Sequence, residues 1–186
     1  MTQTTEAKTN EREAAIDSQI AVSYRALVAA EAAAQTMLES LMSSAAWTSR
    51  SRVRRTNSKS TYRTYIVIDG ELCRATFPAL MPFVDEAKRE RANKVLADLA
   101  SAGDAYDAAE AAYEGWSRFF LVPAGHIHSS MDCSSCNRGR TSTAFSWLPE
   151  LSGLTEADAV AAHGSHLCTV CFPTAPVEWH HTKGAK

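Results

Sequence analysis

Two short cysteine pairs constrain the fold of this chain more than any other feature. Cys133 and Cys136 form the first pair, Cys168 and Cys171 form the second, and 31 residues separate the two. A two-residue gap lets both thiolates of a pair reach one tetrahedral ion, so two pairs can complete the four-sulfur shell that structural zinc prefers. The sequence therefore predicts a zinc ion held by these four cysteines. A closed shell has no open position for water or substrate, so the prediction is a structural role and no reaction.

The alternatives to zinc are four reduced, buried thiols without a metal, or a redox pair. A thioredoxin-like redox pair is less favoured because neither cysteine pair follows a clear strand-to-helix turn. Zinc is favoured because a module of about 50 residues buries too little apolar surface to be comfortably stable, and the ion supplies folding free energy. The fifth cysteine, Cys73, is expected to be a buried apolar residue.

Two histidines precede the first cysteine pair and can change the ligand set. His126 and His128 are two residues apart on a predicted strand, so their side chains face the same way and either could replace a cysteine. His163 and His166, before the second pair, are further candidates, and surface histidines are the alternative for all four. An open site of His126, His128 and Asp132 would allow hydrolysis, but no further acid has suitable spacing. A metal-dependent nuclease or hydrolase is therefore the least favoured function.

The composition is that of a folded protein of one domain or two small ones. The 186 residues are 45% apolar and 22% charged. The first residues lack the pattern of a secretory signal, and no apolar stretch is long enough to span a membrane. We therefore expect the reducing cytoplasm, where disulfides seldom persist and clustered cysteines favour a metal.

A basic segment from Arg50 to Arg63 is the clearest sign of a binding surface. The stretch from Ser40 to Ile68 has six basic residues and no acidic one, although the net charge of the chain is −2. Arginine binds phosphate bidentately and tyrosine can stack on bases. The candidate contacts to DNA or RNA are Arg50, Arg52, Arg54, Arg55, Lys59, Tyr62, Arg63 and Tyr65. The alternative is a solvated linker whose charges pair with acidic helices.

Two long helices are predicted, one on each side of a β-hairpin. Small and apolar residues recur at steps of four and three within residues 11–46 and 82–116, which is typical of helices with one buried side. The first stripe comprises Ile16, Ile20, Ser23, Leu27, Ala30, Ala34, Met37 and Leu41, and the second Val95, Leu99, Ala102, Tyr106, Ala109, Tyr113 and Trp116. The stripes can pair within one chain or across a homodimer. Gly103 can interrupt the second helix, so one helix or two are both compatible with the sequence.

The hairpin and the cysteine-rich module have recognisable turns and caps. Residues 61–77 alternate as two strands around an Asp69-Gly70 turn. Short strands are expected at 119–122, 125–128 and 144–148. Thr155 should cap a short helix that stops at Gly164.

Residues 116–179 contain several unusual short sequence motifs in a fixed order. These are Gly125-His-Ile-His-Ser-Ser130, Cys133-Ser-Ser-Cys136, Trp147-Leu-Pro-Glu-Leu-Ser-Gly-Leu-Thr-Glu-Ala-Asp-Ala-Val160 and Cys168-Thr-Val-Cys-Phe-Pro173. The region resembles a zinc module in proteins encoded by phages of actinobacteria. The resemblance implies a viral protein in the cytoplasm of a bacterial host, with the four cysteines as ligands by position. It implies no mechanism and does not extend over residues 1–115.

We therefore predict an α+β protein: two long helices with an inserted β-hairpin, followed by a small two-knuckle zinc module. The expected organisation is a disordered tail at 1–10, a helical pair with hairpin at 11–117, a zinc module at 118–175 and a flexible tail at 176–186. The expected function is a phage-encoded, non-enzymatic, zinc-stabilised protein that binds nucleic acid or regulates the host. The alternative is an adaptor that docks its helical faces on a host enzyme in host takeover. No membrane partner is expected.

Overall fold

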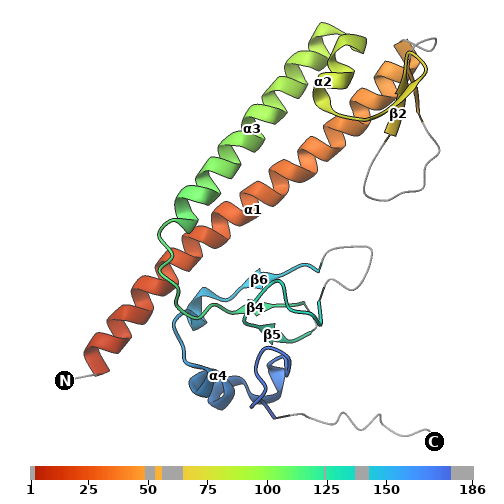
Figure 1. The fold of residues 1–186 in the computed structure, drawn as a ribbon. Helices are drawn as coiled ribbons and strands as arrows, with labels where there is room; N and C mark the ends of the chain where they lie inside the picture. Colours follow the sequence, from red (N-terminus) through yellow and green to blue (C-terminus); the bar gives the residue numbers. More distant parts are fainter. Residues whose placement is uncertain (1–2, 49–52, 56–64, 124, 137–142, 177–186) are drawn as a thin grey trace, which may run out of the picture. The chain divides into compact units, whose positions relative to one another are not determined.

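The computed structural model describes residues 3–48, 53–55, 65–123, 125–136 and 143–176 (Figure 1). The fold is α+β, as predicted. The chain forms two compact units, which we call the knuckle unit (residues 1–21 and 109–186) and the hairpin unit (residues 22–108). The predicted boundary near residue 117 thus lies close to the second junction. The structure adds the first 21 residues to the unit that holds the cysteine pairs.

Two long helices dominate the fold. Helix α1 spans Gln3–Thr48 and helix α3 spans Glu86–Glu110. Helix α1 begins eight residues before its predicted start, so residues 3–10 are helical where a disordered tail was expected. No Gly or Pro interrupts them, and a helix that is already nucleated extends at little cost. Helix α3 runs through Gly103 without a break and ends before Gly115, whose φ of +96° is incompatible with a helix.

A three-stranded antiparallel sheet lies in the hairpin unit. Strands β2 (Tyr65–Ile68) and β3 (Glu71–Arg74) pair around the predicted turn, where Asp69 and Gly70 both have positive φ, as a type I′ hairpin turn requires. Strand β1 (Val53–Arg55) pairs with the other edge of β2, with Val53 opposite Ile68. Part of the basic segment is therefore a strand at the sheet edge.

The core of the hairpin unit joins the end of α1 to the segment after the sheet. Its buried side chains include Leu41, Met42, Leu80 and Ala92. Helix α2 (Phe77–Leu80) is capped by the Thr76 hydroxyl, and the short 3-10 helix η1 (Met81–Phe83) follows it. Both elements precede α3, so the second long helix begins at Glu86 and not near Pro82 as predicted. Pro78 and Pro82 instead stand in the first turns of two short helices, where proline is well tolerated.

Both predicted stripes are covered within the chain. Every stripe residue is buried or half-buried, and Ile20 and Leu41 are fully buried. In the hairpin unit, the rings of Tyr24 on α1 and Tyr106 on α3 lie 5.8 Å apart. Figure 1 shows the two helices side by side and antiparallel in this unit, as the four-and-three pattern predicts.

The knuckle unit combines a small sheet with one short helix. Strands β4 (Phe120–Leu121), β5 (Ile127–His128) and β6 (Ser146–Trp147) form an antiparallel sheet in the order β5-β4-β6. Helix α4 (Glu156–His163) is capped by Thr155 and ends at Gly164, as predicted, and is flanked by the 3-10 helices η2 (Pro149–Leu151) and η3 (Gly164–His166). The buried core of this unit comprises Phe119, Ile127, Ala159, Leu167, Phe172 and Ala175.

A buried aspartate holds the first turns of α1 in the knuckle unit. Asp17 is 1% exposed, and its carboxylate accepts hydrogen bonds from Trp116 Nε1 at 2.8 Å, Arg118 Nε at 2.9 Å and the Ser152 hydroxyl. Arg118 also donates to both carboxylate oxygens of Glu110 at 3.1 Å. These contacts explain why residues far apart in the sequence form one unit. Within the described ranges, no helix is both long and apolar enough to cross a membrane.

Candidate metal centre

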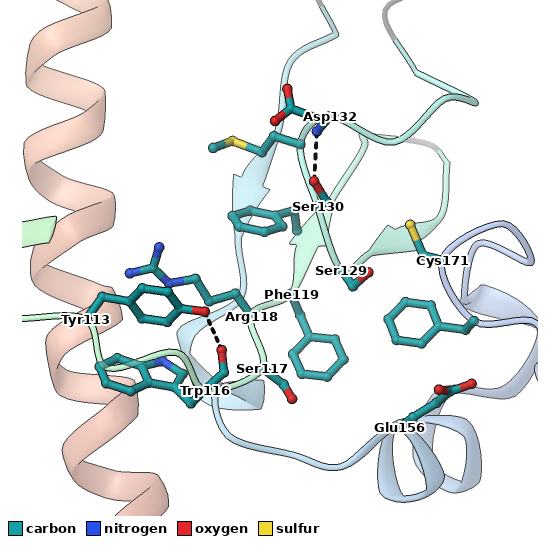
Figure 2. A pocket seen from close by; sticks show the side chains of 13 residues that line it. Tyr113, Trp116, Ser117, Arg118, Phe119, Ser129, Ser130, Asp132, Glu156 and Cys171 are labelled. Carbon is teal, nitrogen blue, oxygen red and sulfur yellow. Dashed lines mark hydrogen bonds between the residues drawn. The ribbon is translucent and has the colours of Figure 1, made fainter.

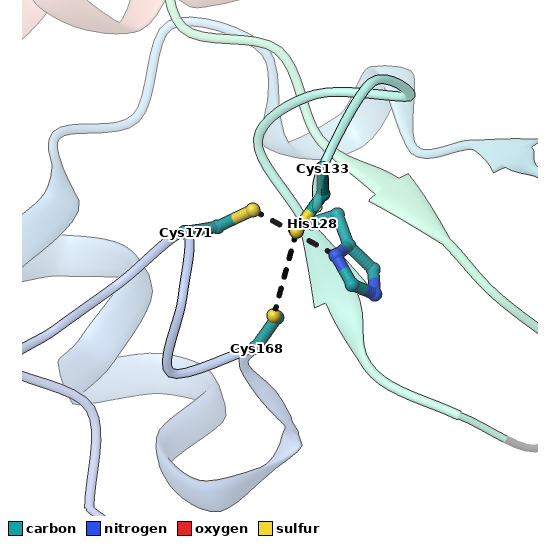
Figure 3. Close-up of side chains that lie close together, drawn as sticks. All are labelled: His128, Cys133, Cys168 and Cys171. Carbon is teal, nitrogen blue, oxygen red and sulfur yellow. Dashed lines mark hydrogen bonds between the residues drawn. The ribbon is translucent and has the colours of Figure 1, made fainter. Parts of the chain in front are cut away.

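Four potential ligands converge in the knuckle unit. One ligand atom from each of His128, Cys133, Cys168 and Cys171 lies within 4.8 Å of all the others (Figure 3). His128, Cys133 and Cys168 are buried and Cys171 is half-buried. Four ligand atoms of this kind around a common centre are compatible with a metal site.

Tight turns and a strand bridge build the cluster. In each cysteine pair the second backbone N–H donates to the carbonyl of the first, from Cys136 to Cys133 at 2.9 Å and from Cys171 to Cys168 at 3.0 Å. His128 is the last residue of β5. The Cys168 backbone N–H donates to the Ile127 carbonyl at 2.9 Å, which holds the second turn beside the histidine. Two turns and one strand thus place three thiols and one imidazole around a common centre.

Two distances within the cluster are close to those expected around a tetrahedral metal ion such as zinc. Zinc bonds of about 2.3 Å to sulfur and about 2.0 Å to nitrogen imply tetrahedral edges of about 3.8 Å between sulfurs and about 3.5 Å between sulfur and nitrogen. The Sγ atoms of Cys133 and Cys168 are 4.0 Å apart, and Cys171 Sγ is 3.7 Å from His128 Nδ1. Three thiolates and one imidazole are a donor set that structural zinc uses.

Cys136 lies beside this group of four. Its Sγ is 3.6 Å from Nε2 and 3.8 Å from Nδ1 of His128, so five donors gather where a tetrahedral ion has four positions. The sequence named Cys136 among the four ligands and His128 as a substitute. The structure brings His128 into the group of four, whereas His126 is exposed and outside it. His163 and His166 are also outside the group.

Hydrogen bonds adjust the thiol pKa values around the centre. Burial raises the pKa of Cys133, but hydrogen bonds from Ser135, followed by His128, outweigh it and lower that pKa to about 6. Burial raises the pKa of Cys171, and the neighbouring Cys133 thiolate raises it further. The Ser135 hydroxyl lies 3.1 Å from Cys133 Sγ and 3.5 Å from Cys168 Sγ. Cys133 therefore loses its proton more readily than Cys171, and a metal ligand must be deprotonated.

Some features of the site had no signal in the cysteine spacing. The role of Ser135 depends on the turn geometry between Cys133 and Cys136. The anchoring role of Asp17 depends on contacts with residues about a hundred positions away. A weak signal did exist for the aspartate, because it follows Ile16 and precedes Ile20 on a helical side that is otherwise apolar.

The predicted nucleic-acid contacts fall largely outside the described residues. Five of the eight candidates are not among the described residues: Arg50, Arg52, Lys59, Tyr62 and Arg63. The backbones of the other three are described: Arg54 and Arg55 are in β1, opposite Val67 and Ile66, and Tyr65 begins β2. The candidate segment therefore includes the edge strand of the sheet in the hairpin unit.

The function has to be argued from the sequence and the structure, because comparisons with known proteins found no match. No protein-family model matches the chain, no curated protein matches it, and no solved structure matches it.

Proposed function

We propose that this chain is a non-enzymatic nucleic-acid-binding protein whose knuckle unit is stabilised by zinc. The donor chemistry supports zinc over other divalent metals, because three cysteine thiolates are soft ligands and one imidazole completes a tetrahedral shell. With four protein donors around it, and a fifth in Cys136 nearby, the ion would have no free position for a substrate. The metal would therefore serve folding and take no part in catalysis.

The observation that carries nucleic-acid binding is the acid-free basic stretch between Ser40 and Ile68. Its two consecutive arginines, Arg54 and Arg55, lie in an edge strand, and the pairing of β1 with β2 brings the segment beside Tyr65. Six cations without an intervening carboxylate give a concentrated positive charge in a chain of net charge −2. Concentrated cations of this kind favour phosphate binding.

The burial of the helical stripes supports this proposal over the adaptor alternative. A helical face that docks on a host enzyme would be exposed in the free protein. All the stripe residues of α1 and α3 are instead buried or half-buried. The basic segment is then the main working surface. The resemblance to phage-encoded proteins supports a bacterial cytoplasm as the setting, where such a protein could act on phage or host nucleic acid.

The test is a filter-binding titration of the zinc-loaded chain with duplex and single-stranded DNA and RNA at rising salt. We expect binding at low salt that weakens steeply with salt, because each phosphate contact releases counterions. The triple variant Arg52→Ala, Arg54→Ala, Arg55→Ala should lose affinity about tenfold or more, and the salt slope should fall by about 3. A matched control removes three cations elsewhere, with Arg25→Ala, Arg91→Ala and Lys94→Ala, and should bind as wild type.

Two results would contradict the proposal. The first is no binding at low salt, and the second is equal weakening by both triple variants. Capture of a host protein that survives nuclease and high salt, together with no nucleic-acid binding, would favour the adaptor.

A further inference from the structure

A pocket of about 450 Å³ lies in the knuckle unit next to the metal centre. Its lining comes from the chain between α3 and β4, the segment before the first cysteine pair, the first turn of α4 and the second cysteine pair (Figure 2). The volume is within the range of about 300–1,000 Å³ that is usual for small-ligand sites. Neither the metal centre nor the basic segment accounts for this pocket.

Aromatic rings form much of its wall. The rings of Phe119 and Phe172 lie 5.8 Å apart with only 3° between their planes, and both side chains are buried and fixed in the core. Tyr113 and Trp116 add two rings 4.8 Å apart in an edge arrangement, and the Arg118 guanidinium already lies over the Tyr113 ring, 3.4 Å from its centre. Figure 2 shows Phe119, Tyr113 and Trp116 among the side chains that line the pocket. Ring faces carry negative potential and attract cations.

The charges around the pocket are unbalanced toward negative. Its one arginine, Arg118, is already neutralised, because it pairs with Asp17 at 2.9 Å and Glu110 at 3.1 Å. Asp132 and Glu156 also line the pocket, and neither makes an ion pair with a basic residue of the described ranges. Glu156 accepts one hydrogen bond, from the Thr174 hydroxyl at 2.9 Å. The pocket is thus lined by two carboxylates, Asp132 and Glu156, and by one arginine whose charge is balanced by Asp17 and Glu110.

We propose that this pocket binds an organic cation, an alkylammonium or guanidinium group. The aromatic walls and the two unpaired carboxylates are complementary to such a group, and the negative surroundings repel phosphate. The source is either a lysine or arginine side chain of a partner protein or a free amine. This surface is separate from the basic segment, so the inference goes beyond nucleic-acid binding and does not depend on it.

The pocket is coupled to the metal centre through one wall. Cys171 lines the pocket, and so does Ser129, which directly follows His128 of the metal centre. Phe172 follows Cys171 directly, and its backbone N–H donates to the Cys168 carbonyl at 2.8 Å. A bound metal would therefore hold the Phe172 ring in place, and metal removal should weaken cation binding.

The test uses isothermal titration calorimetry on the zinc-loaded full chain. The probes are N-acetyl-lysine methylamide, N-acetyl-arginine methylamide and butylammonium, with N-acetyl-norleucine methylamide as the neutral control. We expect saturable binding of at least one cationic probe and much weaker binding of norleucine. The double variant Asp132→Asn, Glu156→Gln should weaken binding about tenfold or more. Glu150→Gln, which removes an exposed carboxylate of η2 outside the pocket, should leave it unchanged.

The outcomes separate the sources of the cation. Tighter binding of the amino-acid probes than of butylammonium assigns the pocket to a protein side chain, and equal binding assigns it to a free amine. Glu156→Gln alone, which lies away from the cysteine pairs, should reproduce part of the loss with an unchanged zinc content. The proposal is overturned if no cationic probe binds saturably, if norleucine binds as well as lysine, or if Glu150→Gln weakens binding as much as the double variant.

Discussion

Replacement of Asp17 by asparagine should strongly destabilise the knuckle unit. The carboxylate of Asp17 is 1% exposed and accepts side-chain hydrogen bonds from Trp116, Arg118 and Ser152. Asparagine keeps the size of the side chain and one acceptor oxygen but loses the charge that faces the Arg118 guanidinium. The side chain of Arg118 is 12% exposed, so the change leaves a largely buried cation with weaker compensation.

The size of the expected stability loss depends on the contacts that Arg118 keeps in the variant. Removal of one member of a buried ion pair typically costs about 3–5 kcal/mol, because the remaining charge stays desolvated. Arg118 keeps its contacts with both oxygens of Glu110 at 3.1 Å, which places the expected loss at the lower end. We therefore expect Asp17→Asn to lower the free energy of unfolding by about 3 kcal/mol.

Urea unfolding of the zinc-loaded chain, followed by circular dichroism, measures this loss. Hydrogen exchange should show the first turns of α1, up to Ala21, opening more readily in the variant. The matched control is Asp98→Asn, which breaks the exposed pair with Lys94 at 3.0 Å and should cost less than about 0.5 kcal/mol. If Asp17→Asn and Asp98→Asn have the same stability and exchange, the anchoring role of Asp17 is wrong.

Three further predictions concern the same unit. Burial, followed by the charge of Asp17, raises the pKa of Glu13, so its ionised form opposes folding at neutral pH. Glu13→Gln should thus melt at a higher temperature than wild type at neutral pH, and the difference should vanish as the pH falls below the ordinary glutamate range; a constant difference would contradict this. Gly153→Ala should lower the free energy of unfolding by at least about 1 kcal/mol, because φ is +79°, a backbone conformation that alanine adopts only with strain; unchanged urea unfolding would contradict it. Cys168→Ser should abolish stoichiometric zinc in metal analysis, whereas Cys73→Ser, in the hairpin unit, should retain it; equal zinc in both would exclude the centre.

Much of the fold was predictable because it depends on local patterns. The four-and-three stripes gave the two long helices, and Asp69-Gly70 gave the hairpin turn. The Thr155 cap and the Gly164 stop of α4 also follow from neighbouring residues. The structure differs at boundaries: α1 begins at Gln3, and the second long helix begins at Glu86, where a start near Pro82 was predicted. Propensity differs little between a frayed and a formed helix end, so such boundaries depend on the rest of the chain.

The details of the candidate site were less accessible because they depend on contacts between distant segments. Spacing predicted the four cysteines as the ligands, with His126 and His128 as possible substitutes, and did not indicate which histidine reaches the centre. The register of β5, with Phe120 opposite His128, buries the His128 ring among the thiols, while His126 lies before the strand and stays exposed. The partners of Asp17, which attach α1 to the rest of the knuckle unit, lie about a hundred residues away and cannot be identified from local patterns. Both features follow from tertiary packing.

X-ray absorption at the zinc edge of the purified full chain, with metal analysis, tests the central claim most directly. The account predicts one zinc per chain, bound by three sulfurs at about 2.3 Å and one nitrogen at about 2.0 Å. Four sulfurs would show that Cys136 displaces His128 from the shell. An oxygen ligand in an exchangeable position, or the absence of stoichiometric metal, would contradict a closed structural zinc centre.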